Sequence, residues 1–309
     1  MGQSPEERTW EDRNPFRPRR PDPPTRQGGF QRYRMFLILI AVFIVVAIVK
    51  GVFNKVDTQG ARASRFVVFS QLLGEQPGTP KLVPALGVIP AGGGEGRPLL
   101  VLVSGRDQTL EALLDKAFYA SLAQLGAEAP DIALLAVDPD GGAHDSSDGK
   151  WGTYIVDEAI PEAIKQTGAD PQRVAIGGFG LGGFGALDLA RLHPRRFCAV
   201  GAHSPEVWQR FGDARPGFFD DAADFARHDV LGAAKAGTYP DAGPLRIDVG
   251  SDDPQRTTVK KLAKALAAAG RSVTYHELAG RDSVRLWRNN SGNLLRFYAA
   301  ALKGCSGRG

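Results

Sequence analysis

Residues 173–187 read Arg173-Val-Ala-Ile-Gly-Gly-Phe-Gly-Leu-Gly-Gly-Phe-Gly-Ala-Leu187. A short apolar run leads into a cluster of glycines, and the residues after the cluster favour a helix. A sharp turn from a strand into a helix needs glycine, because the backbone is tight and the helix packs closely on the strand. Some enzymes use such a turn, G-x-S-x-G, to hold a serine above a sheet. We therefore expect a strand, a sharp turn at Gly180 and a helix.

Similar strand and helix patterns continue on both sides of this turn. Apolar runs that predict buried strands occupy residues 99–103, 132–137, 173–176, 197–200, 245–249 and 273–277. Apolar residues at helical spacing occupy residues 110–125, 154–166, 259–266 and 294–301. The charged stretch 220–228 is typical of a solvated helix, which would place His228 in water. Alternating strands and helices predict an α/β fold with a mostly parallel sheet and helices on both faces.

The N-terminal part of the chain has a different composition. Residues 1–34 are rich in Pro, Arg, Glu and Gln and show no apolar periodicity, which predicts a disordered arm. Met35–Phe53 is an apolar stretch of the length that spans a bilayer, and we expect a single transmembrane signal anchor there. Arginines are denser before this stretch than after it, which predicts a cytoplasmic N-terminus and an extracytoplasmic main domain at the cell membrane. A linker over 54–63, one α/β domain over 64–302 and a flexible tail over 303–309 complete the predicted organisation.

Charge and cysteine content exclude several classes of function. The chain has 309 residues and a formal net charge of +4, but residues 1–55 alone carry about +5, so the main domain is nearly neutral. A nearly neutral domain has no basic surface for nucleic acid. Cys198 lies in an apolar run and is expected to be a small buried side chain, with a bridge to Cys305 as the alternative. No spacing of zinc ligands and no phosphate-binding loop is present, so neither a metal nor a cofactor is predicted.

Further motifs keep the order and spacing of a known family. They are the strand 99–103 with Gly105-Arg106, Asp148–Tyr154, Glu158, Ile160-Pro161, His193-Pro194, Phe197, His203–Pro205 and Gly250–Pro254. Over about residues 64–302 the chain resembles the putative-esterase family, which is related to esterase D and the mycolyltransferases. The resemblance implies an α/β-hydrolase fold and a catalytic triad of serine, histidine and an acid.

The chain departs from this family at two of the three triad positions. Gly180 stands where the family has its nucleophilic serine, and Asp282 stands where it has its histidine, whereas Asp253 matches the acid. Backbone N–H groups of Leu181 and Arg106 match the donors that stabilise an oxyanion. Glycine has no group that attacks a carbonyl, and without histidine no base accepts the proton. We therefore expect a hydrolase-like domain without catalysis, with a small-molecule ester or a cell-envelope component as the ligand of its cleft.

An active carboxylesterase or acyltransferase with a relocated nucleophile is the alternative. Ser104 and Ser204 are the candidate nucleophiles, and His203, His276 and His144 are the candidate bases. Such constellations are defined by geometry and not by sequence position, so this alternative requires a serine hydroxyl within hydrogen-bond distance of an imidazole.

The two aspartates suggest another arrangement. If Asp253 and Asp282 lie close together, their like charges would raise the pKa of one carboxyl group, or the pair would recruit a cation. Pairing with Arg281 or Arg285 is the simpler outcome.

Overall fold

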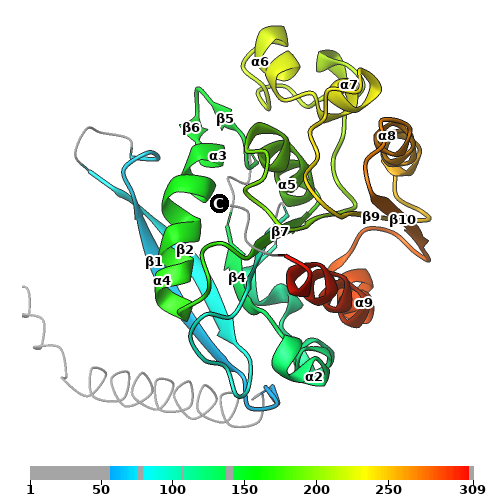
Figure 1. The fold of residues 1–309 in the computed structure, drawn as a ribbon. Helices are drawn as coiled ribbons and strands as arrows, with labels where there is room; N and C mark the ends of the chain where they lie inside the picture. Colours follow the sequence, from blue (N-terminus) through cyan, green and yellow to red (C-terminus); the bar gives the residue numbers. More distant parts are fainter. Residues whose placement is uncertain (1–55, 75–78, 106–107, 137–141, 306–309) are drawn as a thin grey trace, which may run out of the picture. The chain divides into compact units, whose positions relative to one another are not determined.

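An eight-stranded sheet runs through the part of the chain that the computed structural model describes, namely residues 56–74, 79–105, 108–136 and 142–305 (Figure 1). In spatial order the strands are β1 (Arg62–Ser70), β2 (Lys81–Ile89), β4 (Asp131–Leu135), β3 (Leu99–Val103), β7 (Val174–Phe179), β8 (Val200–His203), β9 (Leu245–Gly250) and β10 (Val273–Leu278). Strand β2 pairs antiparallel with β1 and β4, and every other neighbouring pair is parallel. The predicted mostly parallel sheet is therefore confirmed.

Helices cover both faces of this sheet. One face carries α3 (Trp151–Tyr154), a π-helical turn (Ile155–Ala159), α4 (Ile160–Thr167), α5 (Leu181–Leu192), α7 (Val230–Lys235) and α8 (Arg256–Ala268), and the other face carries α2 (Lys116–Gln124) and α9 (Val284–Lys303). The smaller elements are α6 (Ala222–Arg227), the hairpin of β5 (Asp145–Ser146) and β6 (Gly149–Lys150), and 3₁₀ turns at Leu110–Leu113, Gly126–Glu128 and Phe211–Asp213. In Figure 1, α2 and α9 lie together on one side of the sheet.

The core forms two layers, one on each face of the sheet. Strand β3 shows how the sequence builds them, because its five residues are all fully or almost fully buried. Leu99, Val101 and Val103 pack in one layer, and Leu100 and Leu102 pack in the other. Side chains alternate along a strand, so a continuous apolar run fills both layers at once.

Two sequence-based boundaries need correction, and one hairpin was missed. The helix expected over 110–125 is a 3₁₀ turn followed by α2, because the Asp115 carboxylate accepts a hydrogen bond from the Phe118 N–H at 2.8 Å and begins a new helix. The strand expected over 197–200 is β8, which begins only at Val200. The hairpin of β1 and β2 was not predicted, since Pro84 and Gly87 interrupt its apolar pattern.

The predicted arm 1–34 and the predicted span Met35–Phe53 lie outside the described residues, which belong to the unit Val56–Gly309. Among the residues that are described, no helix is long and apolar enough to cross a membrane.

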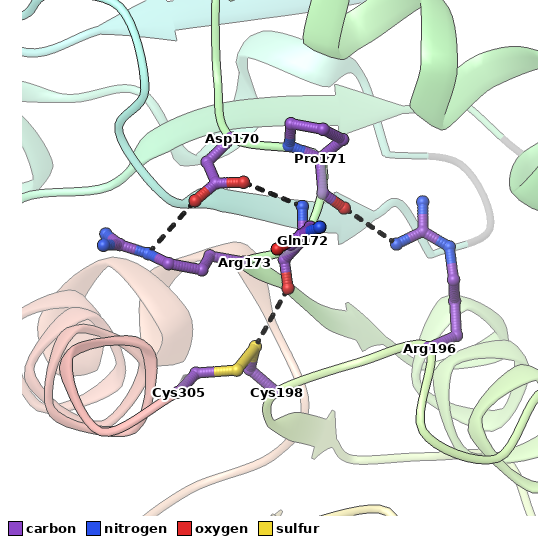
Figure 2. Close-up of a disulfide and its surroundings, with 7 residues drawn as sticks. All are labelled: Asp170, Pro171, Gln172, Arg173, Arg196, Cys198 and Cys305. Atoms are coloured by element: carbon purple, nitrogen blue, oxygen red, sulfur yellow. Dashed lines mark hydrogen bonds and ion pairs between the residues drawn. A yellow bond between two sulfur atoms is a disulfide. The ribbon is translucent and has the colours of Figure 1, made fainter. Parts of the chain in front are cut away.

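A disulfide bond joins Cys198, just before β8, to Cys305, just after α9 (Figure 2). The two Cα atoms lie 5.8 Å apart, and the cysteines are 107 residues apart in the sequence. Cys198 is buried as expected, but the expectation of an unpaired side chain was wrong. Only the packing of α9 against the sheet brings the second cysteine to it, and no local pattern in the sequence reports that contact.

Candidate functional site

Gly180 occupies the sharp turn between β7 and α5, at the carboxyl edge of the sheet. Its φ of 54° and ψ of −117° lie in a region that side chains rarely adopt. Three backbone hydrogen bonds hold this conformation. The Gly180 N–H donates to the His203 carbonyl at 3.0 Å, and its carbonyl accepts from the N–H groups of Phe184 at 3.1 Å and Glu206 at 3.2 Å. The predicted strand–turn–helix unit therefore has Gly180 at its apex.

Glycine is favoured at different positions of this turn for different physical reasons. A Cβ atom on Gly182 would overlap the carbonyl oxygens of Val103 and Ser104, and one on Gly178 would overlap the carbonyl of Gly182. A Cβ atom on Gly180 would come no closer than 4.0 Å to its nearest neighbour, a Cα atom. Packing therefore requires glycine on both sides of the turn, whereas only the backbone angles favour it at position 180.

Asp282 lies in the loop between β10 and α9, and its carboxylate faces a tryptophan. The Trp287 indole N–H donates to Asp282 Oδ1 at 2.7 Å, and Trp287 is completely buried. Burial, together with the negative charges of Asp253 and Glu206, raises the pKa of Asp282 to about 6 against the lowering effect of the hydrogen bond from the indole. Position 282 therefore presents a carboxyl group that changes its charge close to neutral pH.

Asp253 lies on the loop between β9 and α8. Its Oδ1 accepts a hydrogen bond from the Gln255 N–H at 2.8 Å, which closes a local turn. Asp253 is close enough to Asp282 for its charge to act on that carboxyl group. The expectation that the two aspartates come together, and that one pKa rises, therefore agrees with the structure. The expected arginine partner does not, since a tryptophan takes that place.

Glu206 is a third carboxylate in this group and was not among the predicted site residues. Its N–H donates to the Gly180 carbonyl, and its charge acts on Asp282. The sequence contains one indication of this role, because Glu206 lies just beyond the end of a predicted strand, where functional loops gather in α/β folds. Among the described residues, no group of three or more histidines, cysteines or acids is arranged to hold a metal ion.

The expected oxyanion donors are described only in part. Leu181 is the first residue of α5, where N–H groups have no partner within their own helix. Leu181 directly follows Gly180, and its role as an oxyanion donor stays a prediction. Arg106, the other expected donor, lies outside the described residues.

The serines and histidines proposed for a relocated site do not meet. The Ser204 hydroxyl is buried and accepts a hydrogen bond from the Gly250 N–H at 3.4 Å. The backbone N–H of Ser104 donates a hydrogen bond to the Leu135 carbonyl at 2.9 Å. Across the described ranges, no hydrogen bond between a serine hydroxyl and a histidine ring is present. The relocated constellation therefore has no geometric support.

His203 instead belongs to a buried polar network behind the turn. Its Nδ1 lies 2.8 Å from Asp248 Oδ2, and its Nε2 lies 3.0 Å from the Tyr298 hydroxyl. Burial would raise the pKa of Asp248, but hydrogen bonds and positive charge from His203 and Arg246 lower it to about 2. The Nδ1 atom of His276 lies 2.9 Å from the other carboxylate oxygen of Asp248, Oδ1. These groups are satisfied by one another and hold the strands together.

Two further histidines, His144 and His228, also lie in structural surroundings. His144 is buried among aromatic rings, including those of Phe184, Phe218 and Phe219. His228, which was expected to be solvated, is buried as well, and its Nδ1 lies 2.6 Å from Asp188. That expectation failed because His228, which directly follows α6, turns inward to Asp188, and the charge pattern of the sequence does not reveal this contact.

An open hollow of about 740 Å³ lies on the described part of the chain. It is lined by Ser147 and Asp148 of the β5–β6 turn and by residues 211–220, which follow β8. Residues 211–220 follow the carboxyl end of β8 in the eight-stranded sheet, the edge at which ligands bind in open α/β folds, whereas Ser147 and Asp148 belong to the separate β5–β6 hairpin. Phe211, Phe219 and Arg215 give this hollow apolar and basic surfaces.

Comparison with known proteins gives one family. Residues 88–291, more than half of the chain, match the family described as "Putative esterase". A ferulic acid esterase is 18% identical with a TM-score of 0.66, and the match covers 78% of this chain and 98% of that one. An S-formylglutathione hydrolase from Agrobacterium tumefaciens is also 18% identical, with a TM-score of 0.63 and coverage of 79% and 96%. A fluorophosphonate-binding serine hydrolase from Staphylococcus aureus, FphF, is 13% identical, with a TM-score of 0.58 and coverage of 77% and 98%. No curated protein matches the sequence.

Proposed function

The chain belongs to the putative-esterase family and has an α/β-hydrolase-like fold, and on that premise we propose that it is a non-hydrolytic member, anchored in the cell membrane, whose main domain binds a ligand outside the cytoplasm. The observation that carries the proposal is Gly180. The turn that presents a nucleophile in such a fold is intact in its backbone, yet the residue at its apex has no side chain. A carbonyl carbon placed there would meet no attacking atom.

The surroundings of Gly180 support the loss of hydrolysis. Asp282 holds the position that matches the family's histidine, and its neighbours are an indole N–H and two other carboxylates. An imidazole accepts a proton from a hydroxyl at one nitrogen while an acid holds the other nitrogen, and a carboxylate cannot make both contacts. Loss of both nucleophile and base leaves only binding and oxyanion stabilisation.

Two features support a location at the membrane and outside the cytoplasm. The first is the apolar stretch Met35–Phe53 in the sequence, with its arginine-rich N-terminal flank. The second is the disulfide between Cys198 and Cys305, because such bonds persist in oxidising compartments and are rare in the cytosol. The two features are independent, since one concerns the arm and the other concerns the folded domain.

The ligand proposed for this domain is a small ester or a component of the cell envelope. The hollow beside residues 211–220 offers aromatic surface, one guanidinium and two carboxylates, Asp148 and Asp220. Such a mixture suits a molecule with apolar and hydroxylated parts. No cofactor is required for binding of this kind.

Ester hydrolysis by the purified full-length chain tests the central claim. Nitrophenyl acetate and butyrate measure turnover, and a fluorophosphonate probe reports an activated serine. We expect neither turnover nor labelling. Robust turnover that disappears in Ser104→Ala or Ser204→Ala would mean that an active site exists elsewhere, and the proposal would be wrong.

The orientation has a separate test. Protease added to intact cells that express the full chain should digest the main domain and spare residues 1–34. Complete protection of the domain, with digestion only after lysis, would place it in the cytoplasm.

A further inference from the structure

Four ionisable side chains are buried together beside the segment that lines the hollow of about 740 Å³. They are His144, just before β5, Asp188 of α5, Asp224 of α6, and His228, just after α6. The two aspartates are completely buried, and His144 and His228 are only 1% and 6% exposed. Charged side chains are almost never fully buried without partners, so the contacts of these four residues decide their charge. We call them the His–Asp cluster.

Within the cluster, Asp188 and His228 are fully partnered. Asp188 Oδ1 accepts a hydrogen bond from Arg191 at 2.7 Å, and Asp188 Oδ2 lies 2.6 Å from His228 Nδ1. The other ring nitrogen of His228, Nε2, faces Asp224 Oδ1 at 3.6 Å. A positive charge on His228 therefore has a carboxylate beside each ring nitrogen.

His144, in contrast, is surrounded by aromatic rings. Neither nitrogen of its ring makes a hydrogen bond. Its ring centroid lies 4.7 Å from that of Phe218, 5.0 Å from that of Phe219 and 6.1 Å from that of Phe184. The Nε2 atom is 4.0 Å from Asp224 Oδ2, which is too far for a hydrogen bond. A neutral imidazole suits these surroundings, whereas an imidazolium has two N–H groups that both need an acceptor.

The oxygen closest to His144 is already in use. Asp224 Oδ2 accepts the Asp220 N–H at 3.0 Å, and Asp224 Oδ1 accepts a hydrogen bond from Arg227 at 2.8 Å. A protonated His144 would compete with the Asp220 N–H for Oδ2. The Asp220 side chain in turn accepts a hydrogen bond from the Ser147 hydroxyl at 2.5 Å, and both residues line the hollow. A shift at Asp224 is therefore transmitted to the wall of the hollow.

The charges around His144 set the direction of the effect of pH. Burial and then the positive charge of His228 lower the pKa of His144. The charges of Asp224 and Asp188 and the backbone of Phe218 oppose this lowering. Further charged groups around the cluster, among the residues described, are Arg191, Arg215, Arg227 and Asp220. An imidazole in water has a pKa of about 6.5, so acid favours an arrangement in which His144 is exposed over the closed one.

We propose that the His–Asp cluster is a pH-sensitive switch: when His144 takes up a proton, Asp224 releases the Asp220 N–H, the segment 218–220 moves, and the hollow changes shape. Phe219 extends the movement, because its ring packs against both histidines of the cluster and also lines the hollow. The rest of the sheet keeps its structure, since the switch involves only the loops and α6 at one edge.

Hydrogen exchange followed by mass spectrometry tests the switch in the purified full-length chain. Exchange is measured at about pH 7.5 and about pH 5.5 and corrected for the intrinsic effect of pH on amide exchange. Protection of peptides that cover residues 218–220 should fall by up to about tenfold at the lower pH, the limit that one proton with an open-state pKa of about 6.5 allows. Peptides from the buried strands β3 and β7 should keep their protection.

Variants identify the group that takes up the proton. His144→Leu fills the aromatic pocket with an apolar side chain that cannot titrate, so the protection of residues 218–220 should no longer depend on pH. His144→Gln, which is also neutral, gives the same comparison if the leucine variant does not fold. His193→Gln is the matched control, because His193 follows α5 and lies outside the cluster, and it should behave as the wild type does.

Three results would overturn the proposal. Protection of residues 218–220 that is equal at both pH values in the wild type would mean that no switch exists. An equal loss of protection in the wild type and in His144→Leu would mean that the proton binds elsewhere. A parallel loss in β3 and β7 would show global unfolding by acid in place of a local movement.

Discussion

Replacement of Gly180 by serine separates the cost of the turn from the chemistry that it lacks. A Cβ atom at this position has no neighbour closer than 4.0 Å, so the substitution creates no steric overlap. The φ of 54° remains, however, and a residue with a side chain in such a region costs about 1–3 kcal/mol. For a domain of this size each kcal/mol lowers Tm by about 2–4 °C, so we expect Gly180→Ser to lower Tm by about 2–12 °C.

Two matched variants make this expectation sharp. Gly180→Ala has the same backbone strain without a hydroxyl group, and its Tm should fall by a similar amount. Gly182→Ala places a methyl group on the carbonyl oxygens of Val103 and Ser104, so it should destabilise the domain far more. Thermal unfolding of the full-length variants, followed by circular dichroism, measures all three. A Gly180→Ser variant as stable as the wild type, or one as unstable as Gly182→Ala, would refute the reasoning.

The same variant carries a prediction about activity. Gly180→Ser alone should not hydrolyse nitrophenyl esters, because Asp282 cannot act as the imidazole does. Gly180→Ser combined with Asp282→His should give measurable turnover if Asp253 holds the new ring. Turnover by the single variant equal to that of the double variant would show that another group serves as the base.

Three further predictions concern stability. Removal of the disulfide, by Cys198→Ser with Cys305→Ser or by a reducing agent, should lower the free energy of unfolding by up to about 4–5 kcal/mol, because the bond closes a long loop. Denaturant titration measures this change. An unchanged midpoint would mean that the bond is absent in solution. In the folded protein the pKa of Asp282 is raised from 3.8 to about 6, so the free energy of unfolding should fall as the pH rises from about 4 to 6 and stay low above pH 6. Asp282→Asn should remove this pH dependence and raise Tm at pH 8. An Asp282→Asn variant that is no more stable than the wild type at pH 8 would contradict this prediction. Tyr298→Phe removes the hydroxyl partner of buried His203 and should cost about 1–3 kcal/mol in the same titration, whereas a neutral effect would indicate that water replaces the hydroxyl.

The sequence predicted the centre of the fold because its signals there are local. The apolar run Leu99–Val103 is long enough to fill both core layers. Glycine is required at Gly178 and Gly182 because a Cβ atom at either position would overlap a neighbouring carbonyl group. Both features follow from properties of a few adjacent residues. For the same reason the expected position of Gly180 at the turn agrees with the structure.

The remaining features depend on contacts between distant segments. Cys198 meets Cys305 only because α9 packs on the sheet, and His228 is buried only because α6 turns it towards Asp188. Glu206 joins the carboxylates through the loop after β8, whose course the sequence does not specify. Charge pattern and composition describe a segment in water, so they cannot report which side of it another segment will cover.

The disulfide also determines how the domain responds to mechanical force. Cys198 and Cys305 are 107 residues apart in the sequence, and the segment between them contains β8, β9, β10 and the helices from α6 to α9. A pull along the chain passes from one cysteine to the other through the sulfur atoms and does not load the enclosed segment. At about 3.5 Å per residue, roughly 370 Å of contour length is withheld from extension. A domain tethered at one end and pulled at the other would therefore lengthen only over the part from β1 to Cys198, while strands β8, β9 and β10 stay closed until the bond is reduced.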